Sequence, residues 1–170
     1  MVRKNNFRYD SPETKNIDKG AIVPSTIGKE LALYVVYYSP MQMAADLPKH
    51  YSKHLEAFEF IKNVPVDWSE RIILDSEFRE YVTIARKDKN SGNWYVGGIT
   101  NENERNLKIN FSFLDMKKDY KLVMYTDTED THWKHNPMKY QIRQQKIKSE
   151  DTININLAPG GGFAFEIIEL

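Results

Sequence analysis

The sequence from residue 80 onward alternates apolar and polar residues with a period of two, in seven segments separated by short loops. The clearest alternation is in residues 107–113 and 152–157, where one side of each strand would face a core and the other would face water. Loops such as residues 88–93 are too short for the crossover helices that parallel strands need, so the strands must be antiparallel. The pattern predicts a mostly β fold, an antiparallel β-sandwich of about seven to eight strands. The seven segments are 80–87, 94–100, 107–113, 120–127, 141–148, 152–157 and 162–169.

Residues 24–63 have a different pattern, which predicts a helix, a short strand and a second helix. Ile27, Leu31 and Val35 have helical spacing, and Ser25 or Thr26 is suited to cap the first helix. Pro40 would end that helix. The apolar run 41–45 then predicts a short buried strand, and residues 52–62 predict the second helix.

These patterns divide the chain into three parts. Residues 1–22 mix charge, Asn and Gly without a sustained period, and we expect a mobile polar lead-in there. Residues 23–64 form the helical unit, and residues 65–170 form the sandwich domain.

Composition excludes several classes of function. The 24 basic and 24 acidic residues cancel, and no basic patch alternates with aromatic residues, so we expect no nucleic-acid partner. Without cysteine there can be no disulfide framework, thiolate zinc site or thiol nucleophile. No segment approaches the roughly 20 apolar residues of a membrane-spanning helix, and the polar first 20 residues do not resemble a secretory signal. We therefore expect no membrane partner, and the sequence leaves the localisation open.

The sequence contains no convincing metal or catalytic motif. The pairs His50/His54 and His132/His135 have spacings that could serve a metal, but no third ligand clusters with either pair, so we predict no metal site. No Gly-x-Ser-x-Gly elbow is present. Acidic residues are abundant, yet most fall in turns or on wet strand faces, and we predict no catalytic pair among them.

Two residues are candidates for contact with substrate. Asp46 follows the predicted short strand, a position where α/β folds place functional groups, but capping the next helix is an equally good interpretation. Trp133 lies in the polar loop DTEDTHWKHNP and is a candidate for stacking on a sugar. Trp94 and Tyr95 are adjacent in a strand and must point to opposite faces, so they cannot share one sugar platform.

Several motifs, in order along the chain, resemble the C-terminal end of glycoside hydrolase family 97, a family of α-glucosidases and α-galactosidases. The similarity covers about residues 23–168. It is carried by VPSTIGKELALYVVYYSPMQMAADLPKHY, FIKNVPVDW, YVTIARKDKNSGNWYVGGITNENER, THWKHNPMKY and LAPGGGFAFEI.

The resemblance implies an architecture and an activity for the parent enzyme. Such enzymes have an N-terminal β-super-sandwich, a catalytic (β/α)8 barrel and a C-terminal β-sandwich associated with oligomerisation. Residues 24–62 would then be the end of the barrel, and the rest the C-terminal sandwich. The family's catalytic glutamates and its calcium ligands would lie upstream, so we expect no catalytic residue and no cofactor in this chain. Asp46 would correspond at most to a position at the barrel mouth. The parent family is typically periplasmic.

The resulting hypothesis is a non-catalytic structural and oligomerisation module, here as a truncated or separately encoded fragment that self-associates or binds a parent glycosidase barrel. A carbohydrate-binding accessory module, with an oligosaccharide as partner, is the alternative. The second alternative is that the chain is part of an active α-glucosidase or α-galactosidase, whose catalytic residues lie on upstream sequence that is missing here.

Overall fold

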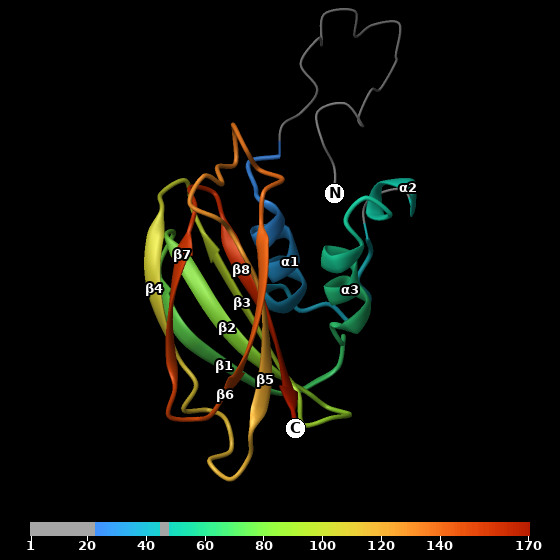
Figure 1. Ribbon diagram of the computed structural model, residues 1–170, viewed down its shortest axis with the longest axis vertical. Coiled ribbons are helices and arrows are strands. Elements are labelled where there is room, and N and C mark those ends of the chain that lie inside the picture. The colour runs from blue at the N-terminus through green and yellow to red at the C-terminus, as the bar shows by residue number, and fades with distance from the viewer. Residues whose placement is uncertain (1–22, 45–47) are drawn as a thin grey trace, which may run out of the picture.

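The structure, a computed structural model, describes residues 23–44 and 48–170. Two antiparallel sheets pack face to face, and the helices of residues 27–36 and 55–63 cover the outer face of the larger sheet (Figure 1). This confirms the predicted mostly β fold, with helices before the strands. The helices are α1 (Ile27–Val36), α2 (Pro48–Tyr51) and α3 (Leu55–Asn63). The strands are β1 (Trp68–Glu77), β2 (Tyr81–Asp88), β3 (Trp94–Thr100), β4 (Arg105–Asn110), β5 (Tyr120–Thr126), β6 (Gln141–Ile147), β7 (Thr152–Leu157) and β8 (Gly162–Glu169).

The larger sheet has six strands in the order β1-β2-β3-β8-β5-β6. Strand β8 lies between β3 and β5, and it pairs antiparallel with both. The smaller sheet consists of β4 and β7 alone. Because β4 and β7 are only two strands, they cannot cover all six strands of the larger sheet, and the inner face of its last strand, β6, stays largely exposed.

Each face of the larger sheet contributes to a separate apolar core. Between the sheets, Phe163 and Phe165 of β8 and Leu122 of β5 pack with residues of the smaller sheet such as Leu157. On the outer face, Tyr95 and its neighbours pack against the helices. Trp94 belongs to the inner core and Tyr95 to the outer one, which confirms that the two rings point to opposite faces. Both side chains are buried.

Helix α1 lies across β3 and β8. Its N-cap is Thr26, one of the two candidates that the sequence offers, and the Thr26 hydroxyl accepts a hydrogen bond from the backbone N–H of Lys29. The helix buries one face, formed by Ile27, Leu31 and Val35 with the small residues between them. It ends at Val36, four residues before Pro40.

The predicted short strand over residues 41–45 is wrong for residues 41–44, which have irregular backbone, while Ala45 lies outside the described residues. This segment folds back on α1, where the side-chain amide of Gln42 donates a hydrogen bond to the Tyr34 carbonyl at 2.8 Å. A strand needs a neighbouring strand to satisfy its backbone, and the described residues provide none beside it. Residues 52–62 were predicted as one helix, but α3 begins only at Leu55. Strand β1 was not predicted.

Candidate functional site

Asp127 is the most buried carboxylate of the sandwich, at the end of β5. One of its oxygens, Oδ2, accepts hydrogen bonds from the backbone N–H groups of Gly162 at 2.9 Å and Ala158 at 3.2 Å. These two donors flank the turn between β7 and β8. The Asp127 carboxylate therefore fixes the corner through which the chain enters the central strand of the sheet.

Glycines allow the backbone to approach Asp127 closely. A Cβ atom on Gly161 would collide with the Asp127 carboxylate, and one on Gly28 of α1 would collide with the carbonyl oxygen of Gly162. The N-terminal turn of α1 thus lies directly against the β7–β8 corner. Lys29, in the same turn, donates a hydrogen bond from Nζ to the Thr100 carbonyl at 2.8 Å and so joins α1 to the end of β3.

The charges at this junction are perturbed by burial. Burial raises the pKa of Asp127 to about 6, against the opposing effects of the Thr26 hydroxyl, the backbone donors and Lys29. Burial also lowers the pKa of Lys29. Two backbone amides donate to one of the Asp127 carboxylate oxygens, and glycines and the first turn of α1 pack against this carboxylate. The arrangement serves structure.

Arg86 of β2 holds the other end of α1. Its Nε donates to the Val35 carbonyl at 2.6 Å and its Nη2 to the Val36 carbonyl at 3.4 Å. The guanidinium group also lies 5.7 Å from the ring centre of Tyr38 and 5.9 Å from that of Trp68. A buried cation here satisfies carbonyls that the last turn of any helix leaves unpaired, and it complements the negative end of the helix dipole.

An exposed apolar surface begins where α1 ends. We call Tyr37, Tyr38, Met41 and Met43 the aromatic–methionine surface. Their exposed fractions are 64%, 61%, 74% and 76%. Single exposed apolar residues are common, but four within seven positions along the chain form a patch of the kind that marks contact sites.

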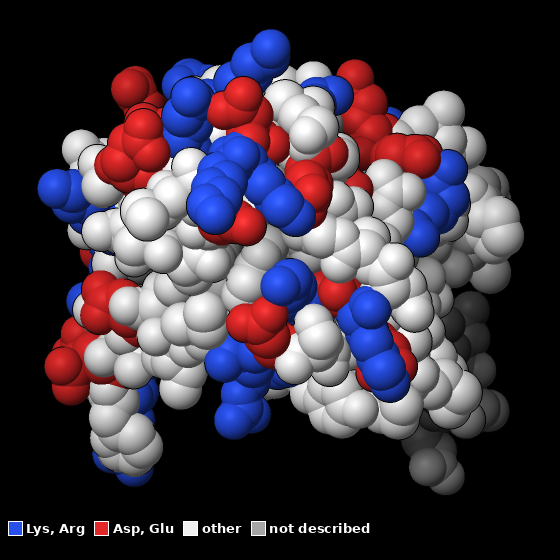
Figure 2. Space-filling view, turned by 90° about the horizontal axis from the view of Figure 1, so that it is seen from below, with Lys and Arg blue, Asp and Glu red and all other residues white. Residues whose placement is uncertain are grey.

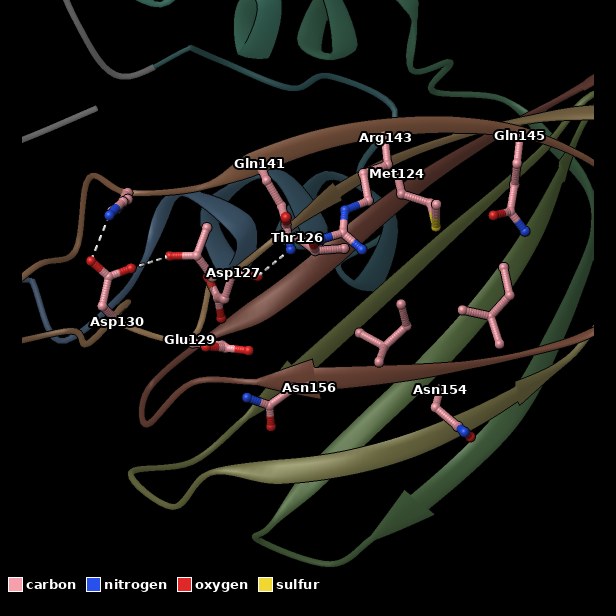
Figure 3. A pocket seen from close by; sticks show the side chains of 14 residues that line it. Met124, Thr126, Asp127, Glu129, Asp130, Gln141, Arg143, Gln145, Asn154 and Asn156 are labelled. Carbon is pink, nitrogen blue, oxygen red and sulfur yellow. Dashed lines mark hydrogen bonds and ion pairs between the residues drawn. The ribbon is translucent and has the colours of Figure 1, made fainter.

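A groove opens between β6 and β7 on the side of the sandwich where the smaller sheet stops (Figure 3). We call it the β6–β7 groove, and its volume is about 570 Å³. Side chains from β5, β6 and β7 line it, together with those of the loop after β5. They are Met124, Thr126, Asp127, Thr128, Glu129, Asp130, Lys139, Gln141, Arg143, Gln145, Ile153, Asn154, Ile155 and Asn156.

The structure places only one of the two predicted contact residues. Asp46 lies outside the described residues. Trp133 lies in the loop between β5 and β6, half-buried, and does not line the β6–β7 groove. Its ring stacks on that of His132, with centroids 6.0 Å apart, and its Cβ and Cγ lie against Gly160. The predicted role of Trp133 in sugar binding stays a prediction.

The remaining polar candidates lie apart from one another. The rings of His132 and His135 are 4.8 Å apart, but within residues 23–44 and 48–170 no group of three or more acidic or histidine side chains could hold a metal ion. Several acids that could have formed a catalytic pair form surface ion pairs instead, as Asp67 does with Lys89 and Glu70 with Lys87. On the face shown in Figure 2, positive and negative side chains alternate over the surface. No helix in the described part of the chain is long and apolar enough to cross a membrane.

Comparison with known proteins gives a consistent result. The family model described as glycosyl-hydrolase 97 C-terminal, oligomerisation, matches residues 67–168. A retaining α-galactosidase of Bacteroides thetaiotaomicron is 35% identical, over 94% of this chain and 24% of its own length. A glycoside hydrolase family 97 enzyme from Pseudoalteromonas sp. strain K8, solved in complex with panose, is 39% identical, with a TM-score of 0.85 over 89% of this chain and 24% of that one.

A more distant structure, a β-arabinopyranosidase, shares the fold, with a TM-score of 0.74 and 21% identity over 98% of this chain and 24% of its own. The chain thus spans about a quarter of the length of each of these relatives.

Sequence analysis did not identify Asp127 and Arg86 as residues that organise the fold. Nothing in the sequence around either residue indicates that its side chain is buried.

Proposed function

Because the chain belongs to glycoside hydrolase family 97 and matches the model of that family's C-terminal oligomerisation domain over residues 67–168, we propose that it is the assembly module of such an enzyme. The module is non-catalytic, and its function is self-association. The observation that carries this proposal is the match of the oligomerisation domain to the whole strand region of the fold. Cleavage of α-glucosides or α-galactosides is proposed for the remaining three quarters of a parent enzyme.

Chemistry within the described residues supports this division of roles. Glycoside cleavage needs two carboxyl groups held on opposite sides of one bond. The most buried carboxylate, Asp127, accepts hydrogen bonds from two backbone amides, and Asp130, at the groove mouth, pairs with Lys139 at 2.6 Å. Calcium would be held by residues of the parent enzyme upstream of this chain.

The aromatic–methionine surface is our candidate for contact with the rest of a parent enzyme. It adjoins α1, whose C-terminal end is fixed on the sheet by Arg86, so the surface is presented on a rigid support. Apolar side chains held close to a fixed helix end can exclude water when a partner docks on them. The occupant we propose is the upstream part of a family 97 chain.

Sedimentation velocity of the 170-residue chain at several micromolar concentrations tests self-association. We expect the mean sedimentation coefficient to rise with concentration. A single monomeric species at every concentration would contradict the assembly role.

Co-expression tests the docking surface. The chain would be produced with a tagged α-galactosidase of the Bacteroides type that lacks its C-terminal quarter. We expect the two to copurify, and the double variant Tyr38→Ser/Met41→Ser to copurify poorly. Phe78→Ser is the matched control, since Phe78 is equally apolar and 83% exposed in the turn between β1 and β2. Equal recovery of all three would show that the aromatic–methionine surface is not the contact.

Activity assays test whether the chain by itself is non-catalytic. We expect the chain alone to show no turnover of p-nitrophenyl α-glucoside or α-galactoside, with or without added calcium. Turnover by purified chain that persists in an independent preparation would contradict the proposal.

A further inference from the structure

The inner face of β6 departs from the rest of the sheet. In β5, Leu122 and Met124 point into the core between the sheets. Gln145 and Arg143 are their cross-strand partners on β6 and point to the same side. Both are exposed, because the smaller sheet does not reach over them. Figure 3 shows Arg143 and Gln145 directed into the β6–β7 groove from above.

The groove carries hydrogen-bonding groups that the protein does not use. Among the residues that the structure describes, the side chains of Arg143 and Gln145 have no hydrogen-bond or ion-pair partner. Asn154 and Asn156 border the groove but point to the opposite side of β7 from Ile153 and Ile155, away from β6. Gln141 donates to the Asp127 carbonyl at 3.2 Å and keeps its own side-chain oxygen free. The Arg143 guanidinium and the side-chain amides of Gln141 and Gln145 together offer several donors and acceptors at planar groups.

The groove combines these planar polar groups with an apolar floor. Ile153 and Ile155 of β7 and Met124 of β5 line it beneath the polar side chains. Its charges leave a small acidic excess: Asp130 pairs with Lys139, Arg143 offsets Glu129, and the third acid, Asp127, accepts hydrogen bonds from backbone amides. A lining of this kind favours a neutral ligand that has both hydroxyl groups and C–H surfaces. The volume of about 570 Å³ is within the range of small-molecule sites.

We propose that the β6–β7 groove binds a neutral oligosaccharide. Arg143 and Gln145 of β6, with the free side-chain oxygen of Gln141, hydrogen-bond to the sugar hydroxyls. The C–H faces of the sugar rings lie over Ile153, Ile155 and Met124. This binding site is independent of the assembly role, which does not require the groove, and it is distinct from the loop that carries Trp133.

An NMR titration of the 170-residue chain tests the site. Maltotriose and raffinose are the probes, and digalacturonate is the charged comparison. We expect a saturable shift of backbone amides in β6 and β7 with at least one neutral sugar, at a dissociation constant of about 1 mM. No saturable shift with either neutral sugar, or binding of digalacturonate alone, would overturn the proposal.

Variants of one strand make the test specific. Arg143→Ala/Gln145→Ala removes side chains on the groove side of β6, and we expect the affinity to fall about tenfold. Gln144→Ala/Lys146→Ala removes exposed side chains on the opposite side of the same strand, and we expect less than a twofold change. If both double variants bind equally well, or if the shifts centre on the Trp133 indole, the sugar binds elsewhere and the proposal fails.

Sedimentation velocity without sugar distinguishes a failure of the sugar site from a failure of the assembly role. The groove proposal expects Arg143→Ala/Gln145→Ala to self-associate like the parent chain. Loss of self-association in that variant would identify the groove as a subunit contact and overturn the sugar site. Failure of the parent chain to self-associate would contradict the assembly role alone.

Discussion

The carboxylate of Asp127 accepts a hydrogen bond from the backbone N–H of Gly162, 2.9 Å away and 35 positions later in the chain. The contact joins the end of β5 to the start of β8, beside the N-terminal turn of α1. Three segments that are distant in sequence thus meet at one buried acid, and the properties of that acid should affect the stability of the whole fold.

Asp127→Asn should flatten the pH dependence of stability. The pKa of Asp127 is raised to about 6 from its ordinary value of 3.8, so the folded protein binds this proton more tightly than the unfolded chain. The resulting stabilisation is complete below about pH 3.8 and is lost as the pH rises through about 6, by at most about 3 kcal/mol. Urea unfolding of the variant at pH 4 to 7 should lack this decline.

The matched control for that substitution is Glu129→Gln, which removes an exposed carboxylate two residues away. Its unfolding free energy should change with pH as in the parent chain. If Asp127→Asn and the parent show the same pH dependence, Asp127 is not the group responsible.

Arg86→Leu should destabilise the protein by about 2–4 kcal/mol. The substitution keeps apolar volume but leaves the carbonyls of Val35 and Val36 buried without their donor. Denaturant unfolding measures the loss, and hydrogen exchange should show faster opening of the last turn of α1. Arg71→Leu, at an exposed position of neighbouring β1, should change stability by less than about 0.5 kcal/mol. Equal effects of the two would contradict the anchoring role of Arg86.

Gly97→Ala should cost about 1–3 kcal/mol. A Cβ there would lie 2.7 Å from the Ala32 carbonyl oxygen and 2.9 Å from the Val35 Cβ, so α1 would have to move away from β3. Gly92→Ala is the comparison, because the atoms that its Cβ would meet belong to the flexible side chain of Glu169. Thermal unfolding should show a clearly lower midpoint for Gly97→Ala only. A similar midpoint for both would mean that α1 is not closely packed on β3.

Phe60→Ala should destabilise the chain by about 3–5 kcal/mol. The Phe60 ring is fully buried and packs edge-on against Tyr95 and Tyr125, with centroids 6.1 and 5.2 Å away. Leu55→Ala, in the same helix but 63% exposed, should have little effect. Urea unfolding monitored by tryptophan fluorescence checks both. If Phe60→Ala were as stable as Leu55→Ala, α3 would not be part of the cooperative unit.

The bounds of strands were well predicted where the local sequence of apolar and turn residues determines them. The bounds of β3, β7 and β8 agree with the predicted segments, because each is rich in β-branched, aromatic or other apolar residues and ends at a polar or turn sequence. The N-cap of α1 was predictable as Ser25 or Thr26, because both have capping side chains, and the structure shows that Thr26 is the cap. Strand β1 was missed since it lies at the sheet edge, where Glu70, Arg71 and Asp75 interrupt the alternation and the pairing with β2 shifts register twice.

Features that depend on distant partners could not be predicted. The apolar run 41–45 predicted a strand, but these five residues alone do not determine whether a neighbouring strand is available to pair with it. Asp127 was indistinguishable from other turn acids, because its burial comes from α1, about 100 positions earlier. The β6–β7 groove was also invisible, because it results from the smaller sheet having too few strands to cover β6.

The central place of β8 also governs the order in which this sheet can form. Strands β3 and β5 are each flanked on one side by β8, so both present an unpaired, aggregation-prone edge until residues 162–169 have been synthesised. The ladder can close only after β8 has been synthesised, so folding of this module is delayed during translation and relies on contacts between residues far apart in sequence. A nascent chain stalled just before Gly162 would be a natural client for chaperones.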